Sequence, residues 1–102
     1  MSYVLILQWP GSSEADFDDL IAMEEQVDTA LGPCGSVDGH DFGSGEMNIF
    51  IETLRPTQAF EVAAAALVKT PKWRDVRAAY RDATGGPYRI LWPKRLQEFS
   101  VR

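Results

Sequence analysis

The spacing of apolar and polar residues predicts five strands and two helices along this chain. Residues 3–9 are nearly continuously apolar and end at Pro10-Gly11, which is typical of a central strand buried on both faces. Between Ser13 and Leu31 the apolar residues recur at helical spacing, and acidic residues fill the first turn. Gly32-Pro33 stops that pattern. The chain is therefore expected to begin with a strand and a helix.

The rest of the chain alternates with the period of strands, then of a helix, then of strands again. Gly43-Ser44-Gly45 separates two strand-like segments and predicts a β-hairpin. A second helix is expected from Pro56 onward, and Thr70-Pro71 ends it because the residue before a proline disfavours the α region. The elements expected after the first helix are a hairpin over residues 35–42 and 46–54, a helix over 56–70, strands over 76–82 and 88–93, and a tail, 94–102, that forms no more than a frayed turn.

The order of these elements predicts the fold class. Strand, helix, strand, strand, helix, strand is the split βαβ pattern of the ferredoxin-like α/β plait, an α+β fold, and here one extra C-terminal strand follows. Two right-handed crossovers place both helices on one face of an antiparallel sheet. The expected strand order is fifth, fourth, first, third, second. The length allows one domain, residues 1–102.

A plait covers one sheet face with its helices and leaves the other face open. In the third expected strand the alternation is clear, and Met47, Ile49 and Ile51 point toward the helices. The second strand continues this pattern if Val37 faces the core, although Gly39 allows a bulge that would reverse it. The residues predicted for the open face are Asp38, His40, Glu46, Asn48, Phe50, Glu52, Arg77, Ala79, Arg81, Arg89 and Leu91. Leu5, Leu7 or Trp9 of the first strand is expected at the centre of this face. Tyr88, Ile90 and Trp92 of the last strand are expected to point toward the helices.

The 102 residues carry a formal net charge of −5, and this charge is divided unevenly. Residues 1–53 hold 11 Asp and Glu and neither Lys nor Arg, whereas residues 54–102 hold all 10 Lys and Arg and 4 acids. In the expected strand order this division gives the sheet an acidic edge and a basic edge. Two copies would then pair with basic edge over acidic edge, so the sequence predicts a homodimer with a salt-sensitive contribution.

The composition also excludes several classes of partner. A net acidic chain lacks the basic surface that broad nucleic-acid binding requires. No apolar run approaches the ~18–20 residues of a membrane span, and the N-terminus lacks the basic flank of a signal peptide. Cys34 is the single cysteine and makes no internal disulfide, which favours the reducing cytoplasm. We therefore expect a cytoplasmic protein without nucleic-acid or membrane partners.

The hairpin around the single histidine is the first candidate site. His40 is a candidate base or ligand, and Asp38 or Glu46 could orient it. A metal would need three converging ligands, which the same three residues could supply, but a histidine without a second His or Cys ligand is a weak signal and no metal or cofactor is predicted. The alternative is a turn-rich hairpin whose glycines provide positive φ and whose polar groups are solvated.

A second candidate site lies among the basic residues of the last two strands. Arg77, Arg81 and Arg89 could hold a carboxylate or phosphate through charge-assisted hydrogen bonds, with Asn48 as a further candidate ligand-binding residue. The alternative is that these arginines pair with the acidic half of the chain. This site predicts a small anionic ligand.

Residues 38–51 resemble the signature of a family of short bacterial proteins. The matching features are Asp-Gly-His, Gly-Ser-Gly-Glu and Asn-Ile-Phe-Ile, then a helix begun by proline and the ending Leu91-Trp92-Pro93. The resemblance covers most of the chain and implies no activity. The plait is also similar to antibiotic-biosynthesis monooxygenase-like dimers and to amino-acid-binding regulatory domains, but the chain matches no residue motif of either group.

Two functions remain open from the sequence. The first is a small binding module of the immunity or regulatory type, which forms a homodimer through its open face or docks a basic protein on its acidic first helix. The second is a small cofactor-free enzyme that uses His40 with Asp38 or Glu46.

Overall fold

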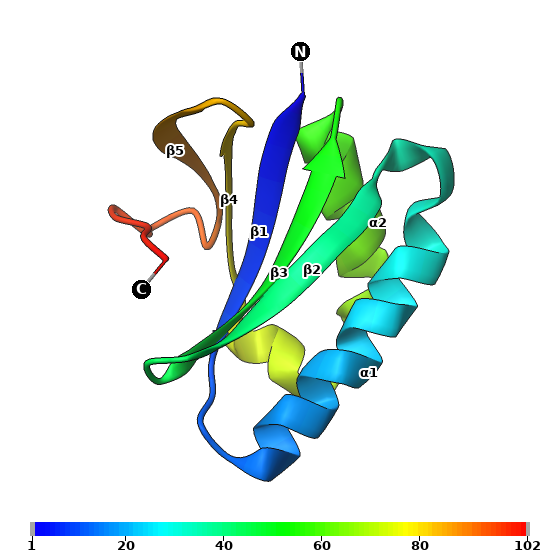
Figure 1. Cartoon of the computed structure of the whole chain (residues 1–102), viewed down its shortest axis with the longest axis vertical. Helices are drawn as coiled ribbons and strands as arrows, with labels where there is room; N and C mark the ends of the chain where they lie inside the picture. Colours follow the sequence, from blue (N-terminus) through cyan, green and yellow to red (C-terminus); the bar gives the residue numbers. More distant parts are fainter. Residues whose placement is uncertain (1, 102) are drawn as a thin grey trace.

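The computed structural model describes residues 2–101 and contains a five-stranded antiparallel sheet in the order β2-β3-β1-β4-β5 (Figure 1). This is the predicted ferredoxin-like α+β plait with an extra C-terminal strand, and the strand order is the predicted one. None of the helices in the described part of the chain is long and apolar enough to cross a bilayer. The elements are β1 (Tyr3–Pro10), α1 (Glu14–Leu31), the 3₁₀ turn η1 (Gly32–Cys34), β2 (Ser36–Gly43), β3 (Glu46–Thr53), α2 (Pro56–Leu67), the 3₁₀ turn η2 (Pro71–Asp75), β4 (Arg77–Asp82) and β5 (Gly85–Trp92).

The two helices lie on one side of the sheet, and the C-terminal segment lies on the other (Figure 1). The core between helices and sheet is built from leucines and isoleucines of β1 and β3 and the apolar stripe of α1. α2 is rich in alanine, and its Ala59 and Ala63 are fully buried, so this helix approaches the sheet closely. The face away from the helices is the open face of the fold.

Local signals in the sequence explain where the elements begin and end. Ser13 caps α1 through a capping box: its Oγ accepts a hydrogen bond from the Asp16 amide at 3.0 Å, and the Asp16 carboxylate accepts one from the Ser13 amide at 3.1 Å. Ser44 and Gly45 both have positive φ, 54° and 79°, as a type I′ hairpin turn requires. α2 ends at Leu67, earlier than predicted, and Thr70 donates its hydroxyl to the Leu67 carbonyl at 2.7 Å.

The alternation predicted for β3 is confirmed, but the expectation for β1 is wrong. Met47, Ile49 and Ile51 belong to the core under the helices. Leu5, Leu7 and Trp9 also belong to that core, so none of them lies on the open face. The open face of β1 is formed by Val4, Ile6 and Gln8, which pair with the open-face residues of β3 and β4. A nearly continuous apolar run gives no indication of which set of residues faces the helices, and for this reason the sequence misassigned it.

The faces expected for β5 are reversed from Tyr88 to Leu91, whereas Trp92, opposite the core residue Ala78, lies on the expected side. Arg89 lies opposite Tyr80, a residue that packs on the helix-side core, and Leu91 packs against the same core. Ile90 lies opposite Ala79, which places it on the open face. The pairing of β4 with β5 shifts register between Ala78 and Ala79 and again between Tyr80 and Asp82. These irregularities break the simple alternation on which the prediction depended.

Two further expectations for the ends of the sheet are corrected. The bulge that Gly39 allows is present: the pairing of β2 with β3 shifts between Val37 and Gly39, and Gly39 has φ 126°. His40 therefore lies opposite Ile49 and faces α1 instead of the open face. The tail is not a frayed turn, because Ser100 is hydrogen-bonded to the sheet and Phe99 packs on Tyr88.

Candidate functional site

His40 and Glu46, predicted to share a site, lie on opposite faces of the sheet. His40 Nδ1 lies 3.0 Å from Glu24 Oε2 on α1, and its ring meets the edge of Phe17 at a centroid distance of 5.9 Å. Glu46 lies on the open face, next to Gln8. No three His, Cys, Asp or Glu side chains among residues 2–101 are grouped so as to hold a metal ion. The predicted pairing of His40 with Glu46 is therefore not formed. Asp38 lies at the bulge and lines a shallow hollow with Glu24 and Asp28 of α1, so its pairing with His40 stays a prediction.

The open face instead carries a buried cluster of polar side chains that the sequence did not reveal as a site. Gln8, Glu46 and Asn48 are 1%, 5% and 0% exposed, although the helices lie on the other side of the sheet. The Gln8 side-chain amide donates to Asn48 Oδ1 at 2.9 Å and to Glu46 Oε2 at 3.1 Å. The Asn48 amide donates to the same Glu46 oxygen at 3.3 Å. Buried polar groups are stable only with such partners, so these three side chains act as one unit.

The C-terminal segment covers this cluster. The main-chain carbonyl oxygen of Ser100 also lies 2.9 Å from the Gln8 side-chain nitrogen, so the two N–H groups of that amide are shared among three acceptors. One residue earlier, the ring of Phe99 meets the edge of Tyr88 on β5 at 5.1 Å, and the guanidinium of Arg81 lies 4.6 Å above the same tyrosine ring. In Figure 1 the segment, drawn in red, lies beside β4 and β5 on the side away from the helices. The segment thus closes the β1, β4 and β5 part of the open face.

An apolar row crosses the open face next to the polar cluster. Strand pairing places Phe50, Ile6, Ala79 and Ile90 side by side on four successive strands. Ile6 and Ala79 are 2% and 0% exposed, even though they lie outside the core under the helices. The helices pack on the other face, and the C-terminal segment, attached at Gln8 and Tyr88, lies on the same face as Ile6 and Ala79. Phe50, nearer the β2 edge, remains partly exposed.

The charged residues of the open face are divided between its two sides. Glu52 on β3 and Arg81 on β4 both lie opposite Val4 of β1, so one row carries an acid and a base on either side of the central strand. Arg77, opposite Gln8, adds a second base on β4. The predicted gradient from an acidic to a basic side is therefore formed by Arg77 and Arg81, without Arg89.

Arg89, the remaining predicted ligand residue, lines a hollow on the helix side. The hollow, of about 470 Å³, lies between the start of α2 and the β4–β5 hairpin and includes Tyr3 and Tyr80, whose rings meet edge to face at 5.7 Å. Arg89 makes no ion pair within residues 2–101. Arg81, at the end of β4, also lines this hollow, whereas Asn48 and Arg77 lie on the open face. The hollow thus brings together two of the four predicted ligand residues, and the four do not form one anion site.

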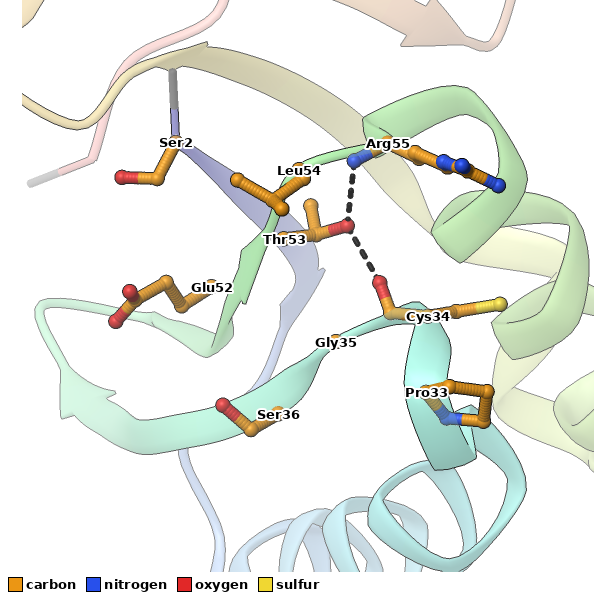
Figure 2. Close-up of a pocket in the computed structure, with 9 residues that line it drawn as sticks. All are labelled: Ser2, Pro33, Cys34, Gly35, Ser36, Glu52, Thr53, Leu54 and Arg55. Atoms are coloured by element: carbon orange, nitrogen blue, oxygen red, sulfur yellow. Dashed lines mark hydrogen bonds between the residues drawn. The ribbon is translucent and has the colours of Figure 1, made fainter.

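A second hollow, of about 410 Å³, lies where η1 meets the end of β3 (Figure 2). Thr53 connects its walls: its hydroxyl donates to the Cys34 carbonyl at 2.6 Å and accepts from the Arg55 amide at 2.9 Å. Figure 2 shows the Cys34 sulfur and the Glu52 carboxylate on opposite sides of this group, pointing away from each other. The contacts connect two chain segments, and no pair of reactive groups converges here.

The carboxyl groups with a clearly lowered pKa lie away from the open-face cluster. Hydrogen bonds from the Thr84 hydroxyl and amide lower the pKa of Asp82, which stabilises the turn between β4 and β5. The Lys72 ammonium and the amides of Ser12 and Ser13 hold the pKa of Asp16 well below its usual range. Both residues therefore have structural partners.

Comparison with protein-family models, with curated proteins and with solved structures finds no significant match to this chain. The resemblance of residues 38–51 to a bacterial family thus stays a prediction, and the candidate function is argued from the open face alone.

Proposed function

We propose that this protein is a small interaction module that pairs with a second copy of itself through the open face of its sheet. The observation that carries the proposal is the arrangement of apolar and charged residues on that face. The apolar row lies next to a row that carries an acid on β3 and a base on β4, on either side of β1. Such a face is self-complementary, as a two-fold interface requires. The single cysteine, which makes no internal disulfide, favours the reducing cytoplasm as the place where it acts.

A two-fold axis along β1, in the plane of contact, would lay β3 of each copy over β4 of the other. Ala79 is fully buried in the single chain, so this pairing requires the C-terminal segment to leave the face. Phe50 of one copy would then lie over Ala79 of its partner, so that a large side chain meets a small one. The residue pairs of the row support this match, because Phe50 and Ala79 flank Ile6 on its two sides. Face-to-face sheets cross at about 30°, so the axis would bisect the small angle between the two β1 strands, and the match holds near that axis.

The same axis would bring opposite charges together. Glu52 and Arg81 flank Val4, so Glu52 of each copy would lie over Arg81 of the other, and the pair would form twice. Exposed ion pairs contribute little to affinity but select orientation and weaken in salt. The charges therefore favour this orientation over one in which acid lies over acid.

Light scattering coupled to size exclusion, at micromolar protein concentration, tests the proposal. We expect a concentration-dependent dimer that is weaker at high salt. Phe50→Glu should shift the protein toward the monomer, because it puts a charge into the apolar row. Val68→Glu is the matched control, since Val68 is 55% exposed and lies just beyond α2, away from the open face. A protein that stays monomeric at every concentration, or a dimer equally sensitive to both substitutions, would refute the proposal.

A further inference from the structure

The C-terminal segment is attached to the sheet almost entirely through side chains of the sheet. Residues 96–101 form neither helix nor strand. Within the described chain, the main-chain hydrogen bond recorded for residues 94–101 joins the Leu96 amide to the Pro93 carbonyl at 3.0 Å, inside the turn that precedes the segment. The contact with the sheet comes from Gln8, which donates to Ser100, and from Tyr88, which packs on Phe99. Segments with so few main-chain bonds are at the low end of local stability.

The chemistry of these contacts is that of peptide recognition. A side-chain amide that donates to a main-chain carbonyl recognises the backbone of the bound segment and does not select the residue type at that position. Asn48 and Glu46 hold the Gln8 amide in place, because both accept hydrogen bonds from it. Selection by residue type comes from Tyr88, whose ring edge receives the aromatic side chain one position before the bound carbonyl.

We infer that Gln8, Asn48, Glu46 and Tyr88 form a recognition site for an extended peptide, and that residues 96–101 of the same chain occupy it and close the open face against a second copy. The closing role rests on the proposed function; the recognition site does not. Ile6 and Ala79, the central residues of the apolar row, are 2% and 0% exposed, and the segment is attached on the same face, at Gln8 and Tyr88. A partner that packs face to face along β1 needs the same two residues, so the segment and the partner compete for one surface.

The segment can compete with a second copy because it is covalently joined to the sheet that it covers. A segment joined by a short flexible linker is present at an effective concentration of about millimolar, so it can occupy its site even if its intrinsic affinity is weak. Removing its aromatic side chain should weaken the attachment about tenfold, the usual scale for one buried contact of this kind. The site would then be free for a peptide added from solution.

The experiment uses the full chain and a fluorescent synthetic peptide with the sequence of residues 94–102. The Phe99→Ala protein, with a weakened segment of its own, should bind the peptide about tenfold more tightly than the natural sequence does, as measured by fluorescence anisotropy. Gln97→Ala is the matched control, since Gln97 is exposed in the same segment. It should behave like the natural sequence, and a peptide with alanine in place of its phenylalanine should not bind.

A second substitution tests the sheet side of the site. Gln8→Leu, added to Phe99→Ala, removes the amide donor while keeping a side chain of similar length, and should abolish peptide binding. Circular dichroism checks that each variant is folded, and Tyr88→Ala, at a partly exposed position, replaces Gln8→Leu if that variant is not. Binding that is equal for all proteins, or absent from Phe99→Ala at the highest peptide concentration, would overturn the recognition site.

The same proteins separate this inference from the proposed function. If the segment closes the face, Phe99→Ala should be more dimeric than the natural sequence by light scattering, and excess peptide should return it toward the monomer. Peptide binding without any dimer would refute the proposed function and the closing role while supporting the recognition site. A dimer that Phe99→Ala leaves unchanged would refute the closing role alone.

Discussion

Asp16 in the first turn of α1 forms an ion pair with Lys72 of η2, a residue 56 positions later in the chain. The same carboxylate accepts hydrogen bonds from the amides of Ser12 and Ser13, at 2.9 Å and 3.1 Å. It therefore joins the start of α1 to the segment that leads into β4. These partners lower the pKa of Asp16, with the Lys72 contact as the largest cause.

The lowered pKa of Asp16 predicts a particular dependence of stability on pH. Because its pKa is lower in the folded chain than in the unfolded one, its stabilising contribution is complete above the ordinary aspartate pKa of about 3.9 and is lost as the pH falls through the folded value. Asp16→Asn should thus lower the urea midpoint at neutral pH, and its difference from the natural sequence should shrink below about pH 4. The control is Asp18→Asn, because Asp18 is an exposed residue of the same helix. A difference that stays constant down to strongly acidic pH would contradict this assignment.

The contact of His40 with Glu24 predicts coupling between β2 and α1. Both side chains are partly exposed, so their interaction should stabilise the fold by less than about 1 kcal/mol. In a double-mutant cycle, His40→Ala and Glu24→Gln should each lower the free energy of unfolding, and together they should cost less than the sum of the two. His40→Ala should be the more costly of the two, because it also removes the ring contact with Phe17. Strict additivity in urea unfolding would show that the two residues do not interact.

The bulge at Gly39 predicts that two glycines of the same strand respond differently to alanine. Gly39 has φ 126°, a region that is essentially restricted to glycine, so Gly39→Ala should cost about 1–3 kcal/mol. A methyl group there would meet no atom within 4 Å, so the cost comes from the backbone alone. Gly43→Ala is the matched control: it also has open space, and no positive φ is recorded for it. Equal stability of the two variants would mean that the bulge does not hold its conformation.

The positions of Glu52 and Arg81 on the open face predict that exchanging these two charges should preserve the dimer. Arg81→Glu should weaken self-association by placing Glu52 of one copy against a new acid on the other, and Glu52→Arg should weaken it by placing two bases together. The double variant, in which the charges are exchanged, should recover most of the dimer. Sedimentation at low salt gives the strongest contrast, because salt screens the pairs. If the double variant is as weak as either single one, the axis does not lie along β1.

The parts of the fold that were predicted correctly are those where polar and apolar residues alternate without interruption. β3 is the best example, because Met47, Ile49 and Ile51 alternate with a set that is polar apart from Phe50, and all three lie in the core. The faces of β1 and β5 were predicted wrongly, for different reasons. β1 is apolar on both faces, and β5 is irregularly paired with β4, so counting residues along the strand did not give the face.

The candidate site was only partly visible in the sequence. Gln8 is the one polar side chain between Val4 and Trp9, and such a residue in an apolar run indicates a buried hydrogen bond. That signal identifies a position but not its partners. Ser100 lies 92 residues away, in a short segment without periodicity, so nothing in the sequence indicates where the segment packs. The contact of His40 with Glu24 depended likewise on a bulge that the sequence allowed but did not require.

β1 precedes the other four strands in the chain but lies in the middle of the sheet, where β4 is one of its two neighbours. The ribosome adds about 5–20 residues per second, so β1, β2 and β3 are complete for seconds before β4 leaves it. During that time one edge of an apolar strand has unpaired main-chain groups, and such edges readily recruit strands of other chains. A nascent chain that stalls before residue 77 is therefore expected to aggregate through β1, a hazard that ends when β4 pairs with it and leaves only β2 and β5 as outer strands.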